Sequence, residues 1–308
     1  MNEHAGSNAG SEGEMGFDGD AGFDPTAPLT PTGNLRRRRL FSRVAESGAT
    51  AAAVVAVAVL VIVVYGVFIH GAGALSLDFL FKGEPEGLGP ALLGTAEIVA
   101  IATLIAMPIS VLVALYLTEY GKGRLAATIR LALDLMNGLP SIIIGLFVFG
   151  LLVYGHQQSA FAGSIALAII MLPLIARGSQ EVLLLVPNNL REAADALGVS
   201  RWRTVLGVIL PSALGGIVTA TVLAVARAAG ETAPLIFLSS VYDGTKASFN
   251  PFEALPNIPV TIYTLSEEAN PEGFTRAWGA GLVLLTLIMF ASLGARALLA
   301  RSRRRMTR

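Results

Sequence analysis

Six long apolar segments follow one another along the chain, separated by shorter polar stretches. Each contains about 20 residues or more, the length that an α-helix needs to cross roughly 30 Å of hydrocarbon. Their continuous apolar character predicts helices, because the strands of a membrane barrel alternate over about ten residues. The predicted spans cover residues 48–70, 90–118, 128–154, 159–182, 212–239 and 278–300.

The two ends of the chain are polar. Residues 1–34 are rich in Gly, Asp and Glu and hold few aliphatic side chains, so they cannot bury enough apolar surface to become ordered. We therefore predict a disordered cytoplasmic tail there. Residues 35–75 combine a basic juxtamembrane stretch with the first span, residues 88–300 hold the other five spans, and residues 301–308 form a basic cytoplasmic tail.

Composition supports a membrane protein. Hydrophobic residues make up 54% of the 308 and charged residues 14%, whereas soluble domains carry about 25% charged residues. There is no cysteine and there are only three histidines, so neither a disulfide nor a metal cluster is predicted. The formal net charge is zero. Charge alone argues neither for nor against nucleic acid, and we expect no nucleic-acid partner.

Basic residues are distributed unevenly around the predicted spans. Most of the 22 Lys and Arg residues precede the first span, follow the sixth, or lie between spans two and three and between spans four and five. All these places share one side of the membrane if the spans alternate. Because basic loops stay in the cytoplasm, both termini are predicted to be cytoplasmic.

The longest connection on that side has the pattern of two short helices and covers residues 186–211, VPNNLREAADALGVSRWRTVLGVILP. Asn188 or Asn189 can cap the first helix, Gly198 suits the left-handed position that ends it, and Ser200 can cap the second. Such a helix lies on the membrane surface, packs on its own bundle, or docks into a groove on a partner. The apolar stripe of the first helix consists of Leu190, Ala193, Ala194 and Leu197.

The same connection resembles the EAA motif of ABC importer permeases. The resemblance implies an all-α integral membrane protein with the type I importer permease (MetI-like) fold. It also implies that the loop docks on a separate ATPase dimer, with the glutamate of the motif orienting it. The matching residues are Glu192, Ala193, Ala194, Gly198, Leu210 and Pro211, while Val208 stands where isoleucine is usual.

The chain has no sequence of the form G-x-x-x-x-G-K-[ST], whose backbone would cradle a nucleotide's phosphates. No Ser/His/Asp or paired-carboxylate arrangement is apparent either. We therefore expect a transport subunit that is not an enzyme and holds no cofactor, with ATP and magnesium on the partner ATPase.

The predicted span 212–239 carries two charges, Arg227 and Glu231, within AVARAAGETAPLIF. On one continuous helix they would share a face deep in the membrane, together with small residues and Pro234. An arginine at the centre of a span costs about 2.5–3.5 kcal/mol. Two explanations stay open: a structural ion pair between neighbouring spans, or a site where the guanidinium binds two oxygens of an anion.

The segments around these charges resemble the A-type permeases of bacterial phosphate ABC importers, the PstA family. The matching segments are ARAAGETAPLIF (226–237), residues 255–285, LYLTEYGKG (115–123) and LPSIIIGLFVFG (139–150). The resemblance implies that Arg227 and Glu231 lie on the route of phosphate beside Thr232, with a secondary role for Arg177. Ser141, which follows Pro140 within a predicted span, is a further polar candidate, and Glu97 has no assigned role.

The resemblance also implies an assembly in the bacterial plasma membrane. Its other members would be a homologous permease (PstC-like), two ATPase copies (PstB-like) and an external phosphate-binding protein (PstS-like) that touches residues 71–89 and 240–277. One alternative is a permease for another oxyanion, such as molybdate, sulfate or phosphonate. Others are a stand-alone channel or secondary carrier and a membrane-embedded structural or sensor subunit.

Overall fold

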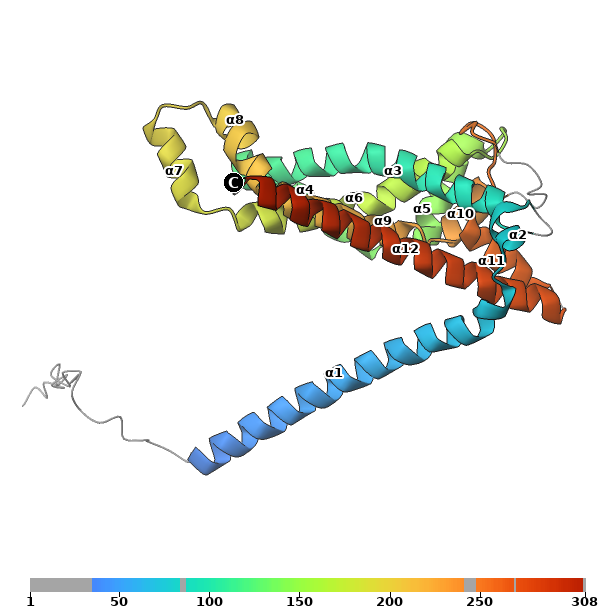
Figure 1. Ribbon diagram of the computed structural model, residues 1–308. Coiled ribbons are helices and arrows are strands. Elements are labelled where there is room, and N and C mark those ends of the chain that lie inside the picture. The colour runs from blue at the N-terminus through green and yellow to red at the C-terminus, as the bar shows by residue number, and fades with distance from the viewer. Residues whose placement is uncertain (1–34, 84–86, 241–247, 269, 307–308) are drawn as a thin grey trace, which may run out of the picture. The chain divides into compact units, whose positions relative to one another are not determined.

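The computed structural model describes residues 35–83, 87–240, 248–268 and 270–306, and every regular element among them is a helix (Figure 1). The predicted disordered tail, residues 1–34, lies outside the described residues, as do residues 307–308 of the predicted basic tail. The chain forms two compact units, Met1–Leu60 and Val61–Arg308. In the first unit, residues 37–60 form a helix that is exposed on all faces.

Twelve α-helices are present in the described residues. π-helical turns follow α3 (Tyr116–Tyr120) and α5 (Phe149–Val153), and a third (Val205–Ile209) joins α8 to α9. The helices are α1 (Leu35–Gly71), α2 (Leu77–Phe81), α3 (Gly89–Leu115), α4 (Gly123–Gly138), α5 (Ser141–Val148), α6 (Ala160–Leu184), α7 (Asn188–Ala196), α8 (Arg201–Thr204), α9 (Leu210–Ala228), α10 (Ala233–Leu238), α11 (Ile258–Glu267) and α12 (Pro271–Met306).

Five helical stretches of the described chain are long and apolar enough to cross a membrane, and they correspond to five of the six predicted spans. The third predicted span, 128–154, is not one straight helix. Its two parts, Gly123–Gly138 and Ser141–Val153, meet at an angle of 101°. Pro140 explains the bend, because a proline forces the preceding residue out of the helical region, and Leu139 is extended with ψ 134°.

The prediction of one continuous helix over 212–239 is also wrong. Helix α9 ends at Ala228, and the short α10 begins at Ala233. Gly230 lies in the connection, and Pro234 occupies the first turn of α10, where a proline is tolerated because the amide would have no helical partner there. The span therefore contains an interruption between Ala228 and Ala233.

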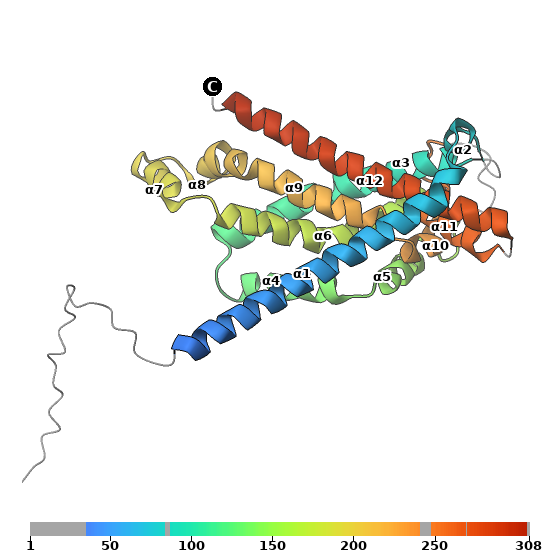
Figure 2. The same ribbon diagram turned by 60° about the horizontal axis from the view of Figure 1, so that its bottom comes forward.

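The core of the second unit is built on α6, which packs along both α3 and α9 (Figures 1 and 2). Small residues allow the helices to approach closely. A Cβ atom placed on Gly178 of α6 would lie 2.6 Å from the Cβ of Ala220 on α9. Between α3 and α6, Ser110 of α3 donates a hydrogen bond of 3.0 Å to the carbonyl of Leu172.

Residues 248–268 are not simply an exposed connection between spans. Asn257 donates to the carbonyl of Ser239, and the hydroxyl of Ser239 donates to the carbonyl of Leu255. Thr95 of α3 accepts a hydrogen bond from the amide of Ile258. Helix α11 then packs against α12, so this segment closes the end of the bundle opposite α7 (Figure 1).

Candidate functional site

Arg227 and Glu231 lie at the interruption between α9 and α10. Arg227 is in the last turn of α9, and Glu231 follows Gly230, so they do not share the face of one helix as expected. The Arg227 Nε lies 3.7 Å from the Glu231 Oε1, which is an ion pair longer than a hydrogen bond. The Arg227 side chain is 56% exposed and the Glu231 side chain 16%. In the part of the chain that the structure describes, N–H groups of the guanidinium therefore remain free to donate hydrogen bonds to another acceptor.

The expectation that Pro234 continues the face of Arg227 is wrong. Pro234 is buried against α5 instead, where a Cβ on Gly145 would lie 2.7 Å from its Cα. Helices α5 and α10 thus lie side by side (Figures 1 and 2). Each begins immediately after an interruption in its span, α5 at Ser141 and α10 after Thr232, so the structure places two broken spans against each other.

Ser141 and Thr232 lie next to these interruptions. Ser141 is the first residue of α5, about 6 Å along the helix from Gly145. Thr232 precedes α10, and its carbonyl accepts hydrogen bonds from Leu235 and Ile236. Both residues are half-buried. Within the described chain neither hydroxyl forms a hydrogen bond, so both are available to a ligand.

Arg177 lies elsewhere. It belongs to the part of α6 that faces α4, and its Nη2 pairs with Asp134 and donates 3.2 Å to the carbonyl of Arg130. The structure therefore connects Arg177 to α4 and does not bring it to the interruption that holds Arg227.

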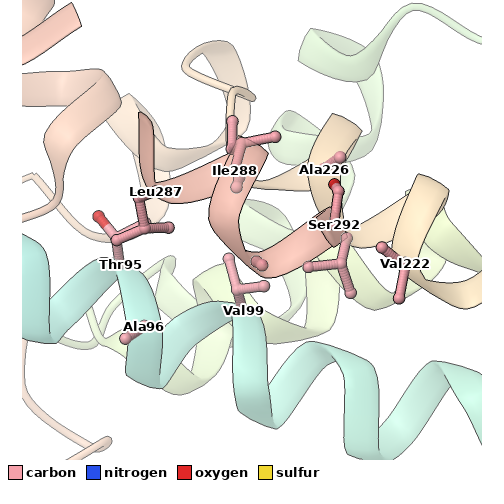
Figure 3. Close-up of a pocket in the computed structure, with 11 residues that line it drawn as sticks. Thr95, Ala96, Val99, Val222, Ala226, Leu287, Ile288 and Ser292 are labelled. Carbon is pink, nitrogen blue, oxygen red and sulfur yellow. The ribbon is translucent and has the colours of Figure 1, made fainter. Parts of the chain in front are cut away.

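A cavity of about 110 Å³ lies between α3, α9 and α12 (Figure 3). Its lining is almost entirely aliphatic, and its two hydroxyl-bearing residues are Thr95 and Ser292. The Thr95 hydroxyl already donates to the carbonyl of Ala91 and accepts from the amide of Ile258. An anion has too few partners here, so the cavity is not part of the candidate anion site.

The connection 186–211 contains the two short helices expected, α7 and α8. Gly198 has φ +68°, as predicted for the residue that ends the first helix. The predicted capping bonds are wrong: Pro187 occupies the cap position of α7, and Ser200 precedes α8 without a side-chain bond. Asn188 instead accepts a hydrogen bond from Arg191.

The apolar stripe of α7 is largely uncovered. Ala194 is buried, but Leu190 is exposed and Leu197 is 81% exposed. Glu192 is also exposed, and within the described chain it forms no ion pair. Most of the stripe therefore does not pack on its own bundle, and α7 and α8 project from one end of the bundle (Figure 1).

Arg191 and Glu119 are the residues that the sequence reasoning missed. They form a buried ion pair between α7 and the turn at the end of α3, with 2.7 Å between Nη2 and Oε1. The position of Glu119, immediately after a long apolar span in LYLTEYG, could have indicated a charge that needs a partner. The sequence does not show that partner, because Arg191 is 72 residues away.

Comparison with known proteins identifies related chains. The family described as the inner membrane component of binding-protein-dependent transport systems matches residues 106–306. The phosphate transport system permease protein PstA 1 of Mycobacterium tuberculosis (strain CDC 1551 / Oshkosh) is 41% identical over 221 residues, covering 68% of this chain and 69% of that protein. The PstA protein of Xylella fastidiosa (strain Temecula1 / ATCC 700964) is 37% identical over 276 residues, covering 87% and 96%.

Solved structures share the fold. A chain of a bacterial alginate ABC transporter aligns with a TM-score of 0.60 at 16% identity, covering 85% of this chain and 98% of that one. A chain of the MetNI methionine ABC transporter aligns with a TM-score of 0.57 at 19% identity, covering 69% and 95%. The expected importer permease fold is confirmed.

Proposed function

Because the chain belongs to the family of inner membrane components of binding-protein-dependent transport systems, and within it to the PstA-type phosphate permeases, we propose that it forms half of a phosphate pathway. It is the permease subunit of an ABC importer of inorganic phosphate. The pathway is completed by a homologous second permease.

This proposal rests on one observation: the side chain of Arg227 is exposed at the interruption between α9 and α10. Interrupted backbone at membrane depth is tolerated where it lies inside protein or lines a water-filled cavity. A charge facing lipid at the centre of a span would cost about 2.5–3.5 kcal/mol. An exposed ion pair such as Arg227 with Glu231 contributes about 0–1 kcal/mol, too little to compensate. The guanidinium therefore faces a pathway.

Each side chain at the interruption has a role in this proposal. The planar fork of Arg227 binds two phosphate oxygens. Glu231 accepts a hydrogen bond from a protonated phosphate oxygen, which sulfate cannot offer at neutral pH, or pairs with Arg227 when the site is empty. Thr232 and Ser141 supply hydroxyls from the two adjacent interruptions. Arg177 has a secondary role toward the opposite end of α6.

The connection 186–211 is the docking element for an ATPase dimer. The exposed stripe on α7 supports this, because an apolar helix face left open by its own bundle fits helix-in-groove recognition. The motif residues Glu192, Ala193, Ala194, Gly198, Leu210 and Pro211 form this element. ATP and magnesium belong to the ATPase, and this chain itself contributes no catalytic group.

The remaining partners and the orientation follow from the same assignment. Both termini are cytoplasmic, the membrane is the bacterial plasma membrane, and an external phosphate-binding protein delivers the anion at the end of the bundle that holds α11. The specific partners are PstC-like, PstB-like and PstS-like proteins.

The test is transport by the purified complex. A tagged ATPase should copurify this chain in stoichiometric amount, whereas a stand-alone carrier would be recovered without it. In proteoliposomes the complex should accumulate radiolabelled phosphate only with ATP present, and excess sulfate, molybdate or phosphonate should not compete. ATP-independent uptake, or stronger competition by another oxyanion, would contradict the assignment.

A further inference from the structure

Glu119 is a buried carboxylate at the end of α3. It lies in the π-helical turn Tyr116–Tyr120, and its side chain is 4% exposed. A carboxylate in such a place is costly unless it is paired and hydrogen-bonded. Its partner shows which element of the fold depends on it.

The partner is Arg191, the fourth residue of α7. Its Nη2 and Nε lie 2.7 and 3.2 Å from Glu119 Oε1, and Nε lies 3.4 Å from Oε2. The Arg191 side chain is 23% exposed. Because two guanidinium nitrogens contact one carboxylate, the contact fixes the orientation of α7 as well as its distance from α3.

The same guanidinium also holds the end of α6. Nη2 donates 3.2 Å to the carbonyl of Leu183, and Nη1 donates 2.7 Å to the carbonyl of Val186. The last carbonyls of a helix have no partner within it, and a basic side chain can satisfy them. Arg191 therefore connects three elements at one point: the end of α3, the end of α6 and the docking helix α7.

Few contacts within the described chain cover α7, whereas the helix ends that Arg191 contacts are packed in an apolar cluster. Within α7 itself, Ala194 is the buried residue. The end of α3, the end of α6, the π-helical turn before α9 and the start of α9 share one apolar cluster, which includes Leu115, Leu183 and Ile209. A movement applied to α7 therefore reaches this cluster through the Arg191 contacts.

We propose that Arg191 and Glu119 are positioning residues that transmit movement of the docking loop to α3 and α6, and thereby couple ATP hydrolysis to transport. The inference rests on the proposed function, since it assumes that the connection 186–211 binds the ATPase. From α6 the movement passes to α9, which packs along it and carries Arg227 in its last turn.

The experiment measures phosphate transported per ATP hydrolysed by the whole purified complex in proteoliposomes. Arg191→Lys keeps the charge but cannot hold the carboxylate and both carbonyls at once. We expect the variant complex to assemble and hydrolyse ATP, with transport per ATP lowered about tenfold, the scale of a typical coupling between sites. The matched control is Arg124→Lys, an exposed arginine at the start of α4, which should leave the ratio unchanged.

A second variant separates transmission from simple structural support. Glu119→Leu combined with Arg191→Met removes the ion pair without leaving a lone buried charge, so the chain should still fold and assemble. Transmission predicts the same loss of transport per ATP as in Arg191→Lys. An unchanged ratio in this double variant, or loss of the ATPase from it, would overturn the inference, because the pair would then serve folding or docking alone.

Failure of the proposed function gives a different result. If the unaltered chain does not copurify with its ATPase, or the unaltered complex does not transport phosphate, the docking or transport assignment fails before any variant is compared. An unaltered complex that transports phosphate, together with an Arg191→Lys variant of equal transport per ATP, removes the coupling inference and leaves the proposed function standing.

Discussion

The side chains of Arg227 and Glu231 differ in exposure: the arginine is exposed, and the glutamate is mostly buried. We predict that Arg227→Lys lowers phosphate uptake about tenfold or more with expression intact. The reason is that lysine loses the fork, and a hydrogen bond to a charged group is worth about 1.5–3 kcal/mol. Arg227→Gln should abolish uptake. Radiolabelled phosphate uptake, normalised to assembled complex, measures both.

The control for the Arg227 variants is a change in its ion-pair partner, Glu231. Glu231→Gln should impair uptake less than Arg227→Gln, since the amide oxygen can still accept a hydrogen bond. Combining Arg227→Gln with Glu231→Gln then discriminates between the explanations. A transport site stays inactive in the double variant although the complex assembles. Recovery of uptake would mean that the two residues are a structural ion pair.

At the scale of elements, the turn between α7 and α8 depends on Gly198. Its φ of +68° is unfavourable for a side chain, although a Cβ there would touch nothing within 4 Å. The cost of Gly198→Val is therefore conformational alone, because a β-branched residue in this region is strained. We predict that the variant inserts into the membrane but loses the ATPase and phosphate uptake. Copurification with a tagged ATPase measures the first loss.

Gly198→Asn is the matched control, since asparagine tolerates the left-handed region. It should keep a substantial part of ATPase binding and uptake. If Gly198→Val itself binds the ATPase and transports phosphate normally, then this turn is not part of the docking element.

For the whole molecule, the distribution of basic residues predicts which side each connection faces. A single cysteine at Ser248, which lies between α10 and α11, should react with an impermeant thiol reagent in intact cells, because this end of the bundle is predicted to be outside. A cysteine at Ser302 should react only after the cells are opened. The chain has no native cysteine to interfere. The reverse labelling pattern would contradict the proposed orientation.

The amino-acid sequence by itself determined most of the helices, the helical connection 186–211 and its glycine. Continuous apolar runs specify helices because a membrane segment must satisfy its own backbone. The helical spacing in 190–197 and the position of Gly198 specify a short helix and its end. The motif resemblance likewise identified the family that the comparisons confirm. All these features depend on residues close together in the chain.

Tertiary structure decided where the spans break and which charges meet. Hydropathy does not distinguish a straight span from two helices meeting at 101°, because it depends only on the composition of the segment. Pro234 leaves the face of Arg227 because Gly145 offers it a close contact on another helix. Glu119 can contact Arg191 because α6 returns the chain, and with it α7, to the end of α3. These contacts join residues far apart in sequence, and packing alone selects them.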